Sequence, residues 1–130
     1  MQPPTVRFRI QFSRDFAVGP GKIDLLEQID RSGSLSQAAR ELKMSYRRAW
    51  LLVDSLNGGF GERLVITSTG GRHGGGASLT PLGRSLIGAY RRFEATMQTR
   101  AARHFDSFAH RNHQSPERPR TAPKRRLAAR

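Results

Sequence analysis

The chain has 130 residues, which is enough for one domain, and 36% of them are hydrophobic. Lysine and arginine number 23 against 10 acidic residues, so the formal net charge at pH 7 is +13. The chain has no cysteine, which excludes a disulfide framework, a cysteine-ligated zinc finger and a thiol nucleophile. No stretch has the pattern of a membrane span or a secretory signal. We therefore expect a cytoplasmic, strongly basic protein with a polyanionic partner, of which nucleic acid is the commonest kind.

The positive charge is shared between two regions. Residues 106–130 contain seven basic and two acidic residues, three prolines and few large apolar side chains. Such a segment buries too little surface to offset its ordering entropy, so we predict a disordered basic tail over 106–130. Residues 1–105 contain 16 basic and eight acidic residues, so the predicted folded domain is basic as well.

A strand and a helix are predicted before residue 34. Apolar and polar residues alternate strictly over 6–12, which is the pattern of a half-buried strand. Ile23, Leu26 and Ile29 follow at helical spacing. Gly33 comes after them and suits the position that follows the last residue of a helix.

Two further helices are predicted directly after the first. Ser34 and Gln37 have the spacing of a capping box, which begins a second helix. Ser45 can cap a third helix that runs from Tyr46 to about Leu56. Two short helices joined by a tight turn are the helix-turn-helix pattern, and its apolar seam is predicted to contain Ala38, Ala39, Leu42, Met44, Ala49, Val53 and Leu56.

The outward face of the third helix distinguishes this pattern from an ordinary helical hairpin in a bundle. Tyr46, Arg47 and Arg48 lie at its N-terminus, where a recognition helix meets base edges and phosphates. Arginine can bond guanine with two parallel hydrogen bonds or pair with a phosphate, so DNA readout is favoured. Trp50, one turn further on, is predicted to be an anchor packed against the first helix; the alternative is that it reads bases.

A glycine-rich hairpin follows the helix-turn-helix. Short apolar strands are predicted over 64–67 and 77–80, and Arg72 and His73 lie between them among glycines. A nucleotide-binding phosphate loop is excluded, because no Gly-Lys-Ser/Thr follows and the segment leads into a strand. We interpret the hairpin as a wing whose tip contacts phosphates or the minor groove; the alternative is a surface loop with no partner.

A long helix is predicted after the wing. Thr80 suits an N-cap and Pro81 the first helical position. An apolar stripe then extends further than so small a domain can cover, which predicts a homodimer; the alternative is packing along its own domain. The predicted dimerisation residues are Leu82, Leu86, Tyr90, Phe93 and Met97. A symmetric dimer requires an inverted-repeat operator with half-sites about 10 base pairs, or a multiple, apart.

Three segments carry a family resemblance, namely Arg-Ser-Gly-Ser-Leu-Ser-Gln-Ala-Ala-Arg at 31–40, Ser-Tyr-Arg-Arg-Ala-Trp at 45–50 and the glycine-rich run at 69–80. In order and spacing they resemble the N-terminal DNA-binding domain of the molybdate-dependent transcriptional regulator (ModE) family over about residues 5–105. A more distant similarity is to the winged helix-turn-helix of LysR-type regulators. The resemblance implies a winged-helix homodimer with the third helix in the major groove and the long helix at the dimer interface.

The resemblance does not extend to the oxyanion-binding domains of full-length members. The chain ends at Arg130 after the basic tail, so we expect no directly bound molybdate, and a molybdate response would need a separate binding protein. The basic start of the third helix also prevents the target sequence from being carried over. The residues predicted to contact DNA are Ser34, Ser36, Gln37, Ser45, Tyr46, Arg47, Arg48, Arg72 and His73.

The expected fold is mainly α with a small β wing, a winged helix-turn-helix with a long C-terminal dimerisation helix. The expected function is sequence-specific transcriptional regulation on double-stranded DNA, linked through the resemblance to molybdate-related genes. Two alternatives stay open: an architectural DNA-binding protein with little sequence preference, and an adaptor that uses the winged helix to bind proteins. No enzyme activity, cofactor or metal site is expected, because the chain has no paired-carboxylate motif or nucleophile turn and its histidines lie near the predicted tail.

Overall fold

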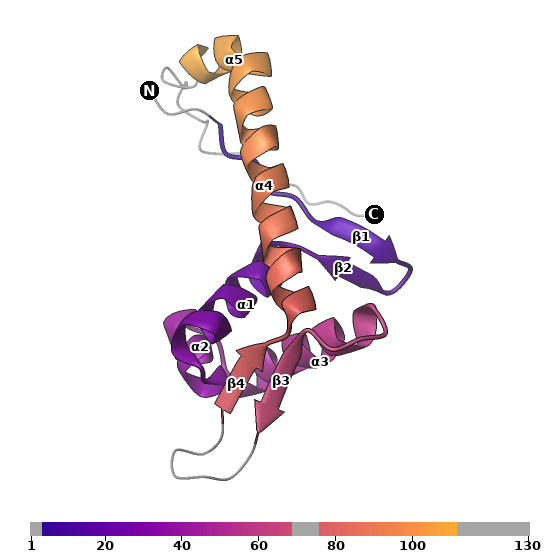
Figure 1. Ribbon diagram of the computed structural model, residues 1–130. Helices are drawn as coiled ribbons and strands as arrows, with labels where there is room; N and C mark the ends of the chain where they lie inside the picture. The colour runs from indigo at the N-terminus through magenta and orange to yellow at the C-terminus, as the bar shows by residue number, and fades with distance from the viewer. Residues whose placement is uncertain (1–3, 69–75, 112–130) are drawn as a thin grey trace, which may run out of the picture.

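A computed structural model describes residues 4–68 and 76–111. The elements in this part of the chain are β1 (Ile10–Ser13), β2 (Phe16–Val18), α1 (Pro20–Ser32), α2 (Leu35–Glu41), α3 (Tyr46–Gly59), β3 (Val65–Ser68), β4 (Gly76–Leu79), α4 (Pro81–His104) and α5 (Asp106–Arg111). Figure 1 shows α4 rising from a base made of α1, α2, α3 and the β3–β4 hairpin, with the β1–β2 hairpin beside its lower half. This is a winged helix-turn-helix with a long C-terminal helix, as the sequence predicted.

The two hairpins form separate antiparallel sheets. In the wing, Val65 is opposite Leu79 and Ser68 is opposite Gly76, one residue away from the predicted strand ends. The predicted strand over 6–12 is shorter than expected, because the ladder covers only Ile10–Ser13. Its partner β2 was not predicted, since three residues are too few to show an alternating pattern.

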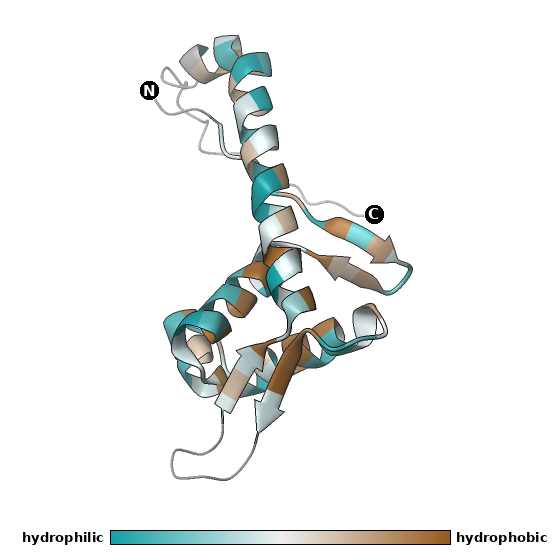
Figure 2. Ribbon diagram, viewed as in Figure 1, coloured by the Kyte–Doolittle hydropathy of each residue, from teal (hydrophilic) through white to brown (hydrophobic). Residues whose placement is uncertain are grey.

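The core is built around α1. Ile23, Leu25, Leu26 and Ile29 of α1 are fully buried, and they form one apolar cluster with side chains from α2, α3, both hairpins and Tyr90 of α4. The predicted seam of the helix-turn-helix is confirmed: its alanines, valine and Leu56 are buried, and its remaining two members are partly buried against them. Coloured by hydropathy, the upper half of α4 is mostly teal and white, whereas the brown segments lie lower (Figure 2).

The predicted helix caps are confirmed. Gly33 ends α1 with a φ of 72° and donates its N–H to Ile29 O at 2.8 Å. Three hydroxyls accept backbone N–H groups at helix starts: Ser34 from Gln37 at 3.1 Å, Ser45 from Arg48 at 3.0 Å and Thr80 from Gly83 at 3.1 Å. The capping box is only half formed, because the Gln37 side chain accepts from Arg40 Nη2 at 2.8 Å and not from a backbone N–H.

A ring cluster attaches the β1–β2 hairpin to the end of α3. Phe60 lies edge-on to Phe12 and Phe16, with ring centroids 4.9 and 5.0 Å away. At Gly59 a Cβ atom would lie 2.4 Å from the Phe16 ring, so only glycine fits beside that ring. The hairpin therefore closes one side of the core.

The segment before β1 runs along α4. The Phe8 ring stacks on Tyr90 with centroids 4.6 Å apart and meets Phe93 edge-on at 5.3 Å. Tyr90 donates its hydroxyl to Phe8 O at 2.8 Å, and Val6 donates its N–H to Gln98 Oε1 at 2.9 Å. Burial raises the pKa of Tyr90, which keeps the hydroxyl a donor. The prediction that Tyr90 faces a partner is wrong, because its own chain buries it.

The first six residues of the predicted tail are helical. Residues 106–111 form α5, and Phe105 donates its N–H to Ala101 O at 2.9 Å where α4 ends. The rest of the predicted tail, 112–130, lies outside the described residues. The prediction of a tail from residue 106 was wrong for these six residues, since a short helix can be continued by local backbone bonds without a large buried surface.

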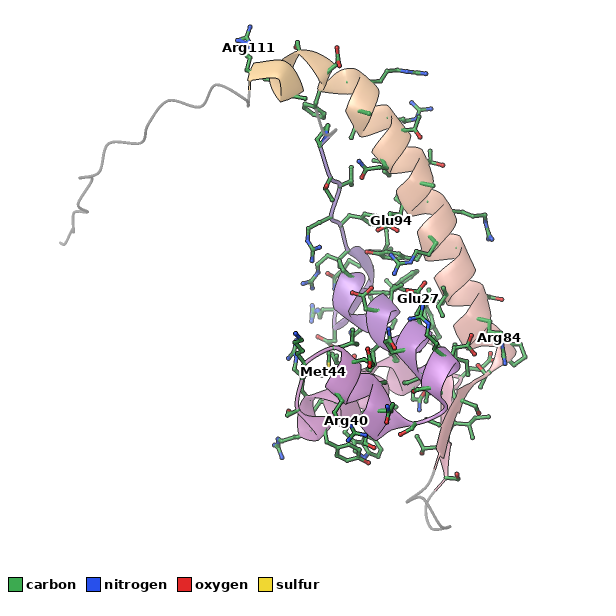
Figure 3. The ribbon with its side chains drawn as sticks, turned by 90° about the vertical axis from the view of Figure 1, so that its left-hand side faces the viewer. Glu27, Arg40, Met44, Arg84, Glu94 and Arg111 are labelled. Carbon is green, nitrogen blue, oxygen red and sulfur yellow. The ribbon has the colours of Figure 1, made fainter. Side chains whose placement is uncertain are left out.

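One arginine ties α4 to α1. Arg91 reaches both carboxylate oxygens of Glu27, at 2.6 and 3.0 Å, and also binds Asp24 at 3.0 Å and Glu94 at 2.9 Å. Glu27 and Glu94 are labelled close together in Figure 3, where α1 faces α4. The hydrogen bonds from Arg91 lower the pKa of Glu27. The cluster therefore fixes the direction in which α4 leaves the base.

We expect Gly83→Ala to lower the free energy of unfolding by about 1–3 kcal/mol, because overpacked sites must shift their surroundings. A Cβ atom there would lie 2.5 Å from Leu64 O, which is backbone and cannot rotate away. Gly58→Ala is the matched control, since nothing lies within 4 Å of its Cβ position. This control should leave stability unchanged or raise it by up to about 1 kcal/mol through helix propensity. Urea denaturation followed by circular dichroism measures both, and equal effects would contradict the close approach.

Glu27→Gln should lower stability by roughly 1 kcal/mol at neutral pH, as expected for a partly exposed ion pair. Because the pKa of Glu27 is lowered in the folded chain, its contribution is complete above its ordinary pKa of 4.5 and is lost as pH falls through the lowered value. The difference in unfolding free energy between parent and variant should therefore shrink as pH falls from 4.5 through the lowered pKa of Glu27. A difference that stays constant to low pH would contradict an ionic role for Glu27.

Candidate nucleic-acid interface

A tight turn sets α3 against α2. Met44 donates its N–H to Ala39 O at 3.0 Å, and Lys43 donates to Arg40 O at 3.1 Å. Lys43 has a φ of 57°, in the left-handed region that favours glycine. The turn is thus as short as the sequence predicted, and it leaves the first turn of α3 pointing away from the core.

The start of α3 presents the predicted contact residues. Ser45 caps the helix, Tyr46 is 53% exposed, and Arg47 and Arg48 are exposed. An α-helix turns about 100° per residue, so Arg47 and Arg48 project to different sides of α3. Around the helix axis, Arg47 lies nearly opposite the core side formed by Ala49, Val53 and Leu56, whereas Tyr46 and Arg48 lie on its two flanks.

The start of α2 carries the other predicted contacts among the described residues. Ser36 and Gln37 are exposed, and Ser34 Oγ lies 3.3 Å from Ser36 Oγ. Ser34 and Ser45 use a hydroxyl lone pair for capping, which leaves the O–H of each able to donate to an acceptor such as a phosphate oxygen. Both serines therefore have a structural role as helix caps, and their contact with DNA stays a prediction.

The prediction that Trp50 is an anchor against α1 is wrong. Its side chain is 42% exposed on the outer side of α3. The helix meets the core through Ala49, Val53 and Leu56, and Trp50 lies roughly a quarter turn around the helix from that side. Size and aromatic character suggested a buried residue, but its helical phase relative to Ala49 and Val53 places it outward.

Asn57 is a structural residue that the sequence reading missed. The sequence predicts that α3 ends at about Leu56, but the helix continues through Asn57 to Gly59. Asn57 Oδ1 accepts from the N–H groups of Leu64 and Val65 at 2.8 and 3.0 Å, and its Nδ2 donates to Val65 O at 3.0 Å. These bonds attach β3 to α3. The available signal was an asparagine seven residues before an apolar strand, which is too weak to identify such a bond.

The wing is held beside the helix-turn-helix. Ala77 donates its N–H to Gly33 O at 2.9 Å, which joins β4 to the α1–α2 turn. Thr80 donates its N–H to Leu64 O at 3.0 Å. The predicted tip residues Arg72 and His73 lie outside the described residues, and their contacts remain predictions.

The surface around the α2–α3 turn is basic. Arg40, Lys43, Arg47 and Arg48 are exposed there, and Glu41 is the exposed acid among them. A cationic surface attracts polyanions and raises their rate of association. In the described part of the chain, no group of three or more acidic, histidine or cysteine side chains could hold a metal ion. The same described residues contain no helix long and apolar enough to cross a membrane.

The comparison with protein families agrees with this geometry. Residues 21–84 match the model of the bacterial regulatory helix-turn-helix proteins of the LysR family. The matched range begins in α1 and ends in the first turn of α4, so it contains both helices of the motif and the wing. Residues 21–84 therefore resemble a LysR-type domain in sequence and have the fold of a winged helix-turn-helix.

The individual relatives have names that refer to molybdenum or to transcriptional regulation. The chain is 40% identical over 97 residues to the molybdenum transport protein ModE of Azotobacter vinelandii, covering 72% of this chain and 36% of that protein. It is 45% identical over 78 residues to the molybdenum-pterin-binding protein MopB of Rhodobacter capsulatus, covering 60% and 29%. Over 71 residues it is 44% identical to the DNA-binding transcriptional dual regulator ModE of Escherichia coli K12, covering 55% and 27%. The chain spans about a third of the length of these relatives.

Proposed function

We propose that this chain is a sequence-specific transcriptional regulator that binds double-stranded DNA through α3. The observation that carries the proposal is the exposed pair Tyr46 and Arg47 at the start of the second helix of a helix-turn-helix. A helix in this position enters the major groove with its N-terminal residues at the base edges. The basic surface of α2 and α3 supplies the sequence-independent attraction to phosphates.

We further propose that its target genes are connected with molybdenum. The support is the similarity to proteins named for molybdenum transport, for binding of molybdenum-pterin and for transcriptional regulation. Those proteins are about three times longer than the region matched here. We therefore propose a similar set of regulated genes for this chain, and not a metal-binding activity.

Replacing Arg47 and Arg48 together by alanine should lower affinity for a duplex selected from random sequence by about 30-fold to 20,000-fold, since each base or phosphate contact contributes about 1–3 kcal/mol. The matched control is Arg100→Ala with Arg103→Ala, which removes the same charge from exposed positions on the upper half of α4. Fluorescence anisotropy at fixed salt measures affinity, and circular dichroism checks that both variants fold.

Two results would contradict sequence-specific binding. Equal losses in the two double variants, with selected and random duplexes bound alike, would favour the architectural alternative, for which only total charge matters. Failure of the parent chain to bind any duplex at low salt would remove DNA binding and favour a protein-binding adaptor.

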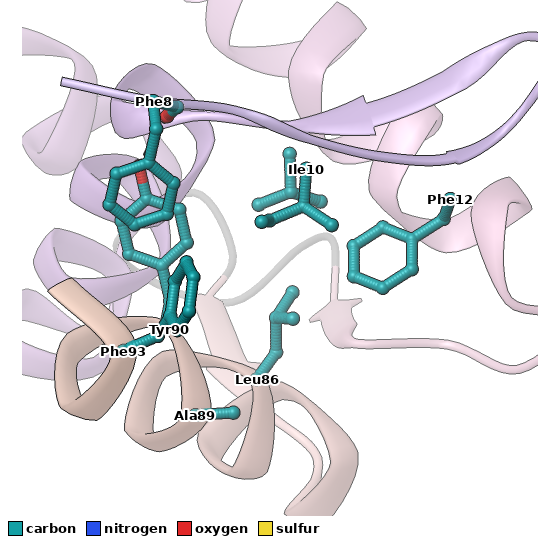
Figure 4. Close-up of a pocket in the computed structure, with 8 residues that line it drawn as sticks. Phe8, Ile10, Phe12, Leu86, Ala89, Tyr90 and Phe93 are labelled. Atoms are coloured by element: carbon teal, nitrogen blue, oxygen red, sulfur yellow. Dashed lines mark hydrogen bonds between the residues drawn. The ribbon is translucent and has the colours of Figure 1, made fainter. Parts of the chain in front are cut away.

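We also propose a homodimer built on α4. Of the five predicted dimerisation residues, Leu82 and Leu86 pack partly against the core of their own domain. Phe93 is 46% exposed, and it borders an apolar hollow of about 100 Å³ between α4 and the β1–β2 hairpin (Figure 4). A second copy placed across this surface would cover Phe93 and bring two copies of α3 to one face of an inverted repeat.

Phe93→Lys with Met97→Glu should convert the dimer to a monomer, because two charges would enter an apolar interface. Thr96→Lys with Thr99→Glu is the matched control, since both threonines are exposed on another side of α4. Light scattering gives the mass, and the interface variant should lose far more affinity for an inverted repeat than for a half-site. A parent chain that is monomeric while binding the full repeat tightly would contradict the dimer.

A further inference from the structure

Three large apolar side chains on the outer side of α3 are left open by their own chain. Tyr46, Trp50 and Leu51 keep 53%, 42% and 57% of their surface exposed. At about 100° per residue they fall within one arc of the helix, about 140° wide, that also contains Arg47 and Asp54. These five residues line an open hollow of about 400 Å³, which we call the α3 cleft.

Packing of the domain does not require the α3 cleft. Another side of α3 supplies Ala49, Val53 and Leu56 to the core, and all three are buried. Large apolar side chains gathered in one exposed patch are typical of a binding surface. An occupant must therefore offer apolar groups to the cleft.

The charges at the edges of the cleft restrict that occupant. Arg47 is exposed at the N-terminal edge, where it can pair with guanine or phosphate. Asp54 is exposed at the other edge, where its carboxylate would repel a phosphate. If α3 enters a major groove, the Asp54 end must lie over base edges and not over the backbone. The apolar group that base edges present in that groove is the C5-methyl of thymine.

We propose that Tyr46, Trp50 and Leu51 form a cleft for thymine C5-methyl groups, so that the chain selects thymine at base pairs beneath the middle of α3. Asp54 accepts a hydrogen bond from the amino group of adenine or cytosine beside the methyl. This inference rests on the proposed function, because it assumes that α3 lies in the major groove. It assigns sequence preference to residues beyond the arginines.

Deoxyuridine tests the proposal directly, because it keeps the base pair and removes only the methyl group. In a duplex selected from random sequence by the full chain, each thymine of a half-site is replaced in turn. Affinity should fall about fourfold at one or more positions, as expected when one buried methyl group is lost. Fluorescence anisotropy at fixed salt measures the ratio for each duplex.

Protein variants then locate the effect. Trp50→Ala and Leu51→Ala should each bind the thymine and deoxyuridine duplexes with nearly equal affinity. Phe108→Ala is the control, since Phe108 is a 63% exposed aromatic on α5, and this variant should keep the parent ratio. Circular dichroism checks folding, and Leu51→Ala decides the test if Trp50→Ala does not fold.

Tryptophan emission gives an independent measurement. Trp50 is the only tryptophan of the chain, so its emission should shift to the blue when the selected duplex covers the cleft. A selected duplex that binds tightly, tolerates deoxyuridine everywhere and leaves the emission unchanged would overturn this inference while the proposed function stands. If the Trp50 emission instead shifts only when a protein partner is added, the thymine-methyl proposal is likewise wrong while the proposed function stands. A parent chain that binds no duplex would overturn the proposed function itself.

Discussion

The placement of the wing depends on the backbone of Leu64, which is held on both sides. Its N–H donates to Asn57 Oδ1 at 2.8 Å, and its carbonyl accepts from Thr80 N–H at 3.0 Å. The first contact comes from α3 and the second from the start of α4. Gly83 lets α4 approach the same carbonyl more closely than any Cβ atom would allow. One residue thus links the helix-turn-helix, the wing and the long helix.

This link has consequences for both proposed surfaces. Because β3 is attached to α3, the base of the wing keeps a fixed position relative to the outer side of α3. Because α4 begins at the same point and is held again by Arg91 farther along, its direction relative to α3 is also fixed. In a symmetric dimer, the spacing of two α3 helices is then set by α4 and not by a flexible connection.

Local features of the fold were predicted from sequence, and nonlocal features were not. Ser45 and Thr80 cap helices because a hydroxyl needs only a backbone N–H three residues away, and that spacing is visible in the sequence. The role of Asn57 and the outward position of Trp50 depend on where α3 meets other elements. The role of Arg91 also depends on nonlocal contacts, since two of its partners lie more than 60 residues away in the sequence. Sequence pattern therefore predicts contact residues at the start of α3 but does not indicate that Trp50 and Leu51 are exposed beside them.

Acidic and basic side chains gather at different places on the domain. Arg91 gathers Asp24, Glu27 and Glu94 where α1 meets α4, whereas the α2–α3 turn carries mainly arginine and lysine. A cluster with more carboxylates than cations repels a polyanion, and the basic turn attracts it. In the proposed complex, this charge distribution would orient the domain on a duplex without reference to base sequence. Discrimination among sequences would then fall to the short-range contacts proposed on α3, where apolar groups act over a few ångströms and are not weakened by salt.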